Sequence, residues 1–161
     1  VVVFCDGGEK YLSERFWGES DTPALTLQPG TAEAIRAHGA ETYPHECCGV
    51  LCGRDGVVSS VLALPNATEE GPRRRFLVRP EDYLKAERRA SELGSDVIGF
   101  YHSHPDHPAR PSQYDLEHAW PFMSYVIVSV RAGVPDAMTS WRLREDRSAF
   151  DPEPLTYAEH H

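Results

Sequence analysis

Two histidines separated by a single residue carry the strongest chemical signal in the sequence. His102 and His104 follow a short apolar run, residues 97–101, that predicts a β-strand. Because a strand projects residues i and i+2 to the same side, both imidazoles can point at one metal ion. Two imidazoles and a carboxylate are a common ligand set for zinc, and Asp115 is the carboxylate that can complete it. A His-x-His pair alone does not require a metal, so a structural role for the two histidines stays open at this point.

The position of Asp115 depends on a helix that Ser112 is expected to begin. Ser112-x-x-Asp115 has the spacing of a capping box, in which a serine and an acid one turn later satisfy the first backbone amides of a helix. The pattern predicts a helix from Ser112 to about Trp120. Docking the start of this helix against the end of the strand would bring Asp115 to the two histidines.

A hydrolytic zinc site also needs a general base, which is commonly a carboxylate. Glu46 is the candidate, because it lies in residues 44–49, between a predicted helix and a predicted buried strand. The spacing along the chain does not by itself connect Glu46 to the histidines. An ordinary solvated loop acid is the alternative interpretation of this residue.

The elements that must position these residues alternate between helices and strands. Helices are predicted at residues 31–41, 80–93 and 112–120, and strands at residues 49–52, 57–64, 76–78, 97–101, 125–130 and 138–143. The segment 102–111 is predicted to be a loop because it contains three prolines. Strands mixed with helices in this order indicate an α/β fold, a sandwich around one mixed sheet.

Length and composition exclude several classes of protein. The chain has 161 residues and a mass of 18.0 kDa, which is enough for one domain with a real core. Its net charge of −9 and pI of about 5.3 argue against nucleic acid as a partner, because phosphate binding needs a basic face. No uninterrupted apolar run approaches the roughly 18 residues of a membrane span, so no membrane segment is expected.

The cysteines do not form a disulfide framework. The chain has four, three of them within residues 47–52, and no Cys-x-x-Cys pair. No secretory signal is visible, and we expect a reducing, cytoplasmic setting. Cys48 and Cys52 are expected to pack in the core. Cys47 is expected to face solvent or the cleft, and a cysteine nucleophile paired with His45 is an alternative to the zinc hypothesis.

The sequence resembles the JAMM metalloprotease signature, the active form of the MPN (Mov34/PAD-1) domain. The resemblance covers roughly residues 25–145 and rests on Glu46-x-Cys48-Gly49-Val50-Leu51-x-Gly53, His102-x-His104-Pro105 and Ser112-x-x-Asp115. It implies a cytidine-deaminase-like αβα sandwich with a central mixed β-sheet. It also implies a zinc ion and the hydrolysis of peptide or isopeptide bonds at the tails of ubiquitin-like proteins.

Carried over residue by residue, the resemblance gives a role to five side chains. His102, His104 and Asp115 correspond to the zinc ligands. Glu46 corresponds to the acid/base that takes a proton from water, whose pKa zinc can lower to roughly 7. Ser112 corresponds to the hydroxyl that steadies the oxyanion.

Two neighbouring residues are given no part in this chemistry. Ser103 lies between the two histidines and should point to the other side of the strand, where we expect a structural role. His107 could be mistaken for a third imidazole ligand, but we expect it not to bind the metal.

Residues 1–13 carry a second resemblance, to the C-terminal end of PLP-dependent cysteine synthases. A hydrophobic run is followed by Asp6-Gly7-Gly8-Glu9-Lys10-Tyr11-Leu12-Ser13, which is similar to the final strand of those enzymes. No PLP-binding lysine segment is present, so synthase activity is not expected from this chain. One interpretation is a natural fusion of a cysteine synthase with a JAMM hydrolase. We therefore expect a lead-in and linker at residues 1–24, a JAMM/MPN+ catalytic domain at 25–150, and a tail ending in a tag remnant at 151–161.

The leading functional prediction is a zinc-dependent hydrolase that releases cysteine from the C-terminal Gly-Gly of a small ubiquitin-like sulfur carrier, with a fused or associated cysteine synthase as its partner. A deubiquitinase-like isopeptidase acting on lysine conjugates is the alternative within the same class. A non-catalytic MPN scaffold is the alternative from another class, and the complete Glu, His, His, Ser and Asp set argues against it. A zinc deaminase is disfavoured because its H-x-E and P-C-x-x-C signature is absent.

Overall fold

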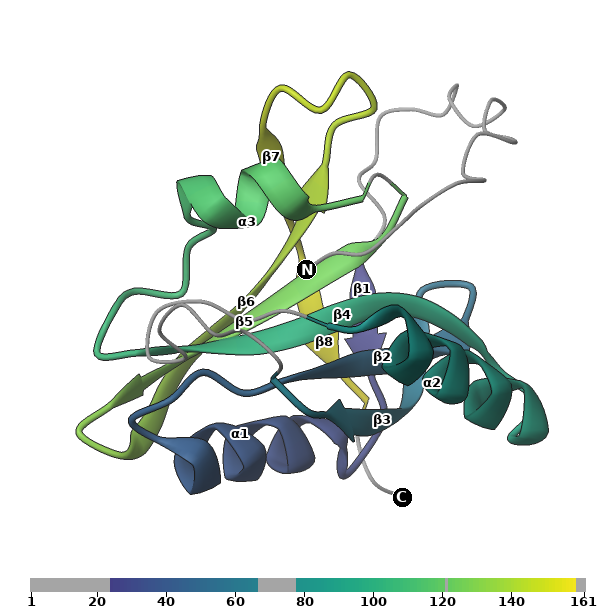
Figure 1. The fold of residues 1–161 in the computed structure, drawn as a ribbon, viewed down its shortest axis with the longest axis horizontal. Helices are drawn as coiled ribbons and strands as arrows, with labels where there is room; N and C mark the ends of the chain where they lie inside the picture. The colour runs from purple at the N-terminus through teal and green to yellow at the C-terminus, as the bar shows by residue number, and fades with distance from the viewer. Residues whose placement is uncertain (1–23, 67–77, 121, 159–161) are drawn as a thin grey trace.

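The structure, a computed structural model, describes residues 24–66, 78–120 and 122–158. These residues form one mixed sheet with helices on both faces (Figure 1). The strands are β1 (Leu25–Leu27), β2 (Cys48–Arg54), β3 (Val57–Leu64), β4 (Asp96–Pro105), β5 (Ser124–Arg131), β6 (Val134–Leu143), β7 (Phe150–Glu153) and β8 (Leu155–Tyr157). The helices are α1 (Thr31–Thr42), α2 (Pro80–Glu92) and α3 (Gln113–His118).

The strands follow the order β7-β6-β5-β4-β2-β3-β1-β8 across the sheet. β4 pairs in parallel with β5, and β1 pairs in parallel with β3 and with β8. The other neighbours are antiparallel, including the β2–β3 hairpin, whose turn residues Asp55 and Gly56 both have positive φ angles. The predicted αβα sandwich with a central mixed sheet is confirmed.

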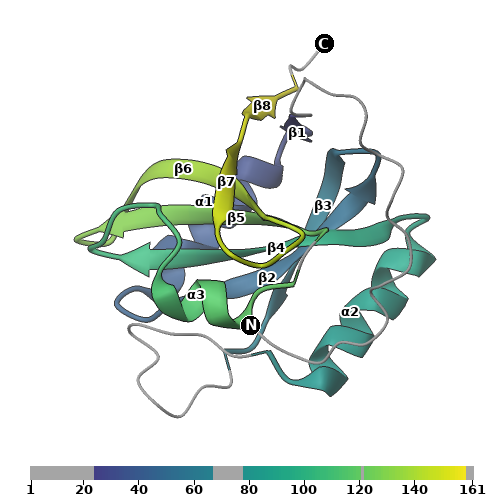
Figure 2. The same ribbon diagram turned by 90° about the horizontal axis from the view of Figure 1, so that it is seen from above.

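The helices divide between the two faces of the sheet (Figure 2). On one face α1 buries Ala32 and Ile35 in an apolar cluster with Leu51, Tyr101 and Val126. On the other face α2 and the end of α3 enclose a second cluster, which includes Tyr83, Phe100, Trp120 and Tyr125. Since successive strand residues point to opposite faces, β4 contributes its Phe100 to one cluster and its Tyr101 to the other.

The structure corrects the prediction for residues 102–105. The prolines in residues 102–111 predict a loop, but β4 continues to Pro105 because its parallel pairing with β5 extends as far as the Pro105–Val130 pair. His102 and His104 therefore lie on β4 itself, rather than on a loop after the strand. At His102 this strand is paired with β2 on one side and with β5 on the other.

Three strands carry no signal that the sequence prediction detected. β1 lies at the start of the predicted catalytic domain, where no strand was predicted, and β7 and β8 lie at the predicted tail. Two of these strands have three residues each, too few for a periodic pattern. Glu153 of β7 is buried and accepts hydrogen bonds from the hydroxyls of Ser124 and Ser140, which joins the tail to the sheet.

Two predictions fall outside the described residues. One is the lead-in with its cysteine-synthase-like residues 1–13, and the other is most of the strand predicted at residues 76–78. Within the described part of the chain, every helix is too short or too polar to cross a membrane.

Candidate metal centre and active site

β4 places the two histidines on the sheet face that carries α3. Their neighbours Tyr101 and Ser103 point the other way, toward α1, where Tyr101 joins the apolar cluster beneath that helix. The alternation along the strand therefore sends both imidazoles to the same side, as the sequence predicts. Both side chains are buried, and their Nε2 atoms lie 3.1 Å apart.

The first turn of α3 brings Asp115 to this pair. The predicted capping box is present: the Asp115 amide donates to Ser112 Oγ at 3.1 Å, and the Ser112 amide donates to Asp115 Oδ2 at 2.8 Å. The same Oδ2 atom lies 3.3 Å from His102 Nε2 and 3.4 Å from His104 Nε2. The cap thus fixes the carboxylate in the orientation that points it at the imidazoles.

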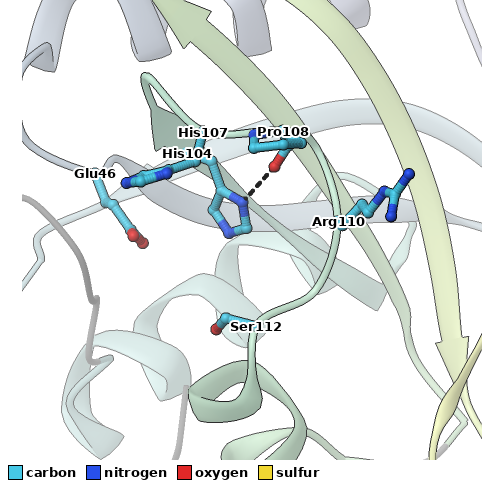
Figure 3. Close-up of a pocket in the computed structure, with 6 residues that line it drawn as sticks. All are labelled: Glu46, His104, His107, Pro108, Arg110 and Ser112. Atoms are coloured by element: carbon cyan, nitrogen blue, oxygen red, sulfur yellow. Dashed lines mark hydrogen bonds between the residues drawn. The ribbon is translucent and has the colours of Figure 1, made fainter.

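A backbone carbonyl determines which ring nitrogen of a neutral His104 carries the proton. His104 Nδ1 lies 2.9 Å from the Pro108 carbonyl oxygen, which can only accept a hydrogen bond, so Nδ1 carries the proton (Figure 3). In the neutral ring this leaves the lone pair on Nε2, the atom that faces Asp115. Metal-bound histidines typically have such a partner on the nitrogen that does not bind the metal.

The three atoms fit a divalent metal ion. His102, His104 and Asp115 form the group of possible metal ligands found among the described residues. Their facing atoms make a triangle with sides of 3.1, 3.3 and 3.4 Å. A tetrahedral site with bonds of about 2.0–2.1 Å separates its ligand atoms by about 3.3–3.4 Å. Buried acceptor atoms that converge at this spacing need a cation or a proton between them.

The charges in this group are strongly coupled. Burial by itself raises the pKa of Asp115, but the adjacent His102 and His104 outweigh it and hold that pKa far below its usual range. Burial lowers the pKa of His102, and the negative charge of Asp115 opposes that shift. An ionised carboxylate beside a neutral imidazole is the state that binds a metal.

Glu46 lies beside this centre, just before β2 begins. Its side chain is buried, and no described residue makes a hydrogen bond to its Oε1 atom. Burial, and then the negative charge of Asp115, raise the pKa of Glu46 to about 9. Glu46 is therefore not the solvated loop acid of the alternative interpretation.

Ser103 ties the Glu46 segment to the histidine strand. Its Oγ atom accepts a hydrogen bond from the Cys47 amide at 2.8 Å, and its own amide donates to the Cys47 carbonyl at 3.2 Å. The Ser103 hydroxyl lies on the face of β4 opposite the imidazoles, and the bond from its amide joins the two backbones. The structural role predicted for Ser103 is confirmed, and it holds the residue next to Glu46 in register with the site.

A cavity of about 380 Å³ opens onto this arrangement. Its lining includes Glu46, His104 and Ser112, and Figure 3 shows these three side chains around the same hollow. His107 also lines the cavity and is not part of the ligand group. Arg110 lines it as well, and sequence analysis missed it, because nothing in its sequence context indicates a functional residue.

The three cysteines that the structure describes take no part in the site. Cys47, Cys48 and Cys52 are all buried and free, so the expectation that Cys47 faces solvent or the cleft is wrong. Burial raises the pKa of Cys47 to about 11, which keeps it a neutral thiol near pH 7. The alternative of a cysteine nucleophile paired with His45, which is exposed, has no support in this geometry.

Comparisons with known proteins agree with the fold and the site. Residues 29–144 match the family model described as prokaryotic homologs of the JAB domain. The chain is 37% identical over 103 residues to a probable TtuB-protein conjugate cleaving protease of Thermus thermophilus, covering 64% of this chain and 68% of that one. It is 28% identical over 136 residues to the CysO-cysteine peptidase of Mycobacterium tuberculosis, covering 84% and 92%. A protein of Salinibacter ruber with a solution structure is 45% identical, with a TM-score of 0.66 and coverage of 84% and 92%.

Fold and comparisons together define a hydrolase of the metallopeptidase class, which excludes the non-catalytic scaffold. The chain belongs to the prokaryotic JAB family, that is, to the JAMM/MPN+ metallopeptidases whose signature the sequence resembles.

Proposed function

We propose that this chain is a zinc-dependent hydrolase that cleaves the bond after the C-terminal tail of a small ubiquitin-like sulfur carrier and releases cysteine. The observation that carries the proposal is the convergence of His102, His104 and Asp115 beside the buried carboxyl of Glu46. The resemblance to a CysO-cysteine peptidase over most of both chains supports the substrate. The cysteine-synthase-like residues 1–13 support a synthase as the neighbouring enzyme.

In this proposal His102, His104 and Asp115 hold the zinc ion. When bound, zinc would supply a Lewis acid for the scissile carbonyl and would lower the pKa of water to roughly 7. The Ser112 amide keeps Asp115 aimed at the ion, and the Pro108 carbonyl keeps the His104 lone pair on Nε2. The chain's own contribution to metal binding is therefore a preorganised set of donors.

Glu46 would move the proton. Its carboxylate takes a proton from the attacking water as the water oxygen bonds to the carbonyl carbon. The carbon–nitrogen bond then breaks, and Glu46 gives that proton to the departing amine. Burial raises the pKa of Glu46 in the metal-free protein, and the positive charge of a bound zinc ion would oppose that shift, so the group can alternate between carboxylate and acid during the reaction.

Ser112 would stabilise the negative charge that develops on the carbonyl oxygen. Its Oγ accepts the Asp115 amide, which fixes the oxygen in place and leaves the hydroxyl proton available to donate. Loss of one such donor typically lowers kcat by about 10²–10³-fold.

The test is incubation of a carrier–cysteine conjugate with the protein, followed by intact mass. We expect loss of one cysteine residue with zinc, no reaction after chelation, and no reaction with Glu46→Gln. Glu81→Gln, an exposed acid on α2, is the matched control and should react like the wild type. Wild-type turnover by Glu46→Gln would show that the assigned base is wrong, and failure to bind zinc at micromolar concentration would rule out the metal site.

The second candidate substrate is a lysine conjugate. The resemblance to a probable TtuB-protein conjugate cleaving protease favours it. The same carrier, joined once to cysteine and once to a lysine side chain, decides between the two. The proposal requires a higher kcat/KM for the cysteine adduct, and a higher value for the lysine isopeptide would replace it with the second candidate.

A further inference from the structure

Among the described residues that line the active-site cavity, Arg110 is the one lysine or arginine. Figure 3 shows it on the far side of His104 from Glu46, with its side chain extending away from Glu46. Arg110 is exposed, and its guanidinium makes no ion pair with any described residue. A permanently charged donor with no ion-pair partner among the described residues thus borders the active-site cavity.

The backbone that carries Arg110 is held firmly. The Arg110 amide donates to the Pro108 carbonyl at 2.8 Å, and that carbonyl also meets His104 Nδ1. The next carbonyl, that of Ala109, accepts the Thr139 hydroxyl at 2.6 Å. The hydroxyl in turn accepts the Trp141 indole N–H at 2.8 Å. The metal ligand His104 and the base of the Arg110 side chain therefore share one rigid segment.

The charge of Arg110 contrasts with its surroundings. The cavity is bordered by Glu46 and, next to it, Asp115, and the whole chain has a net charge of −9. Against the net negative charge of the chain, a local cation on the cavity wall favours the binding of an anionic substrate group. Arginine is suited to this task because its planar fork binds both oxygens of a carboxylate at once.

We propose that Arg110 binds the free α-carboxylate of the amino acid that the enzyme releases. The inference rests on the proposed function and adds a rule of specificity: the residue after the scissile bond should be the last of its chain. A released cysteine has this carboxylate close to its amine. A lysine side chain joined through its ε-amine has none there, since its carboxyl group is part of a peptide bond. Arg110 thus distinguishes a substrate that ends in a terminal amino acid from an isopeptide, and it does so without contacting the carrier.

The test uses two synthetic peptides that end in Gly-Gly-Cys, one with a free C-terminal carboxylate and one with a C-terminal amide. For the zinc-loaded wild type we expect KM to be about 10- to 100-fold lower for the acid than for the amide, with similar kcat. Arg110→Ala should raise KM for the acid to that of the amide and leave the amide unchanged. Arg110→Lys should recover only part of the preference, because it keeps the charge and loses the fork.

A matched variant and a binding arm complete the test. Arg88→Ala removes an exposed arginine of α2 that does not line the cavity, and it should keep the wild-type preference. Calorimetric Kd values for both peptides on Glu46→Gln, with and without Arg110→Ala, measure recognition without turnover. An acid preference that disappears with Arg110→Ala supports the inference even if the wild type cleaves neither peptide, in which case only the proposed reaction fails. Equal binding of acid and amide, or a preference that survives Arg110→Ala, overturns it.

Discussion

The two sides of β4 bury polar groups in opposite ways. On the α1 side the polar atoms have partners: the Tyr101 hydroxyl lies 2.8 Å from His38 Nδ1, and Ser103 Oγ receives the Cys47 amide. On the α3 side, His102 and His104 turn their Nε2 atoms toward a carboxylate oxygen. A fold satisfies its buried polar groups wherever it can, so a side that needs an added ion marks the place of function. One strand therefore serves stability with one row of side chains and chemistry with the other.

The largest expected effect is a loss of activity, from a change on the side of β4 that carries the imidazoles. Glu46→Gln should lower kcat by about 10²–10⁴-fold, because a neutral amide cannot take a proton from water. The fold should be retained, since the side chain keeps its size and loses a carboxyl group that is buried. Steady-state kinetics with saturating zinc and a thermal melt measure both quantities. A melt that drops together with kcat would mean that Glu46 belongs to the structural side.

The next effect is a loss of stability, from a change that meets the side of β4 that carries Tyr101. A methyl group added at Gly49 would overlap the Tyr101 ring and the Leu62 carbonyl oxygen, which are part of the packed sheet. Gly49→Ala should therefore lower the free energy of unfolding by about 3 kcal/mol. Urea denaturation measures the loss. A change below about 0.5 kcal/mol would show that β2 and Tyr101 are packed less closely than the structure has them.

A smaller effect depends on pH. Burial, aided by the charge of Asp115, raises the pKa of Glu46 from 4.5 to about 9 in the metal-free protein. Because the folded pKa lies above the unfolded one, this group's contribution to stability is fully present below about pH 4.5 and is lost as the pH rises to about 9. Relative to Glu46→Gln, the metal-free wild type should lose about 1.4 kcal/mol of unfolding free energy for each pH unit between the two pKa values. Parallel stability curves for the two proteins would contradict the burial of this carboxyl group.

The smallest effect tests the link between the two sides. Ser103→Ala leaves the buried Cys47 amide without its acceptor, which should cost about 1–2 kcal/mol of stability. It should also lower kcat a few-fold through the displaced Glu46, while KM and zinc affinity stay unchanged. Ser59→Ala, a hydroxyl change far along the sheet at β3, is the control and should leave kcat as it is. An unchanged kcat in Ser103→Ala would mean that Ser103 stabilises the fold and does not position Glu46.

The sequence predicts the features that depend on local patterns. The His-x-His spacing, which turns both imidazoles to one side, and the capping box at Ser112 are both local, and the structure has both, although the strand was predicted to end before His102. Glu46 could be connected to them only through resemblance, because β2 and β4 become neighbours through antiparallel pairing of segments far apart in the chain.

Other features could not be predicted because tertiary contacts decide them. The continuation of β4 to Pro105 depends on β5, and the short β1 and β8 strands exist through pairing with each other. Arg110 was missed because an arginine between two prolines has no pattern of its own. Its significance follows from the cavity that the folded chain encloses.

A single oxygen atom, Asp115 Oδ2, both anchors the first backbone amide at the start of α3 and faces the two imidazoles. Any ion that draws electron density from Oδ2 must weaken the hydrogen bond that this oxygen accepts from the Ser112 amide. Hydrogen exchange at that one amide would then report how much of the protein is loaded, in the absence of any substrate.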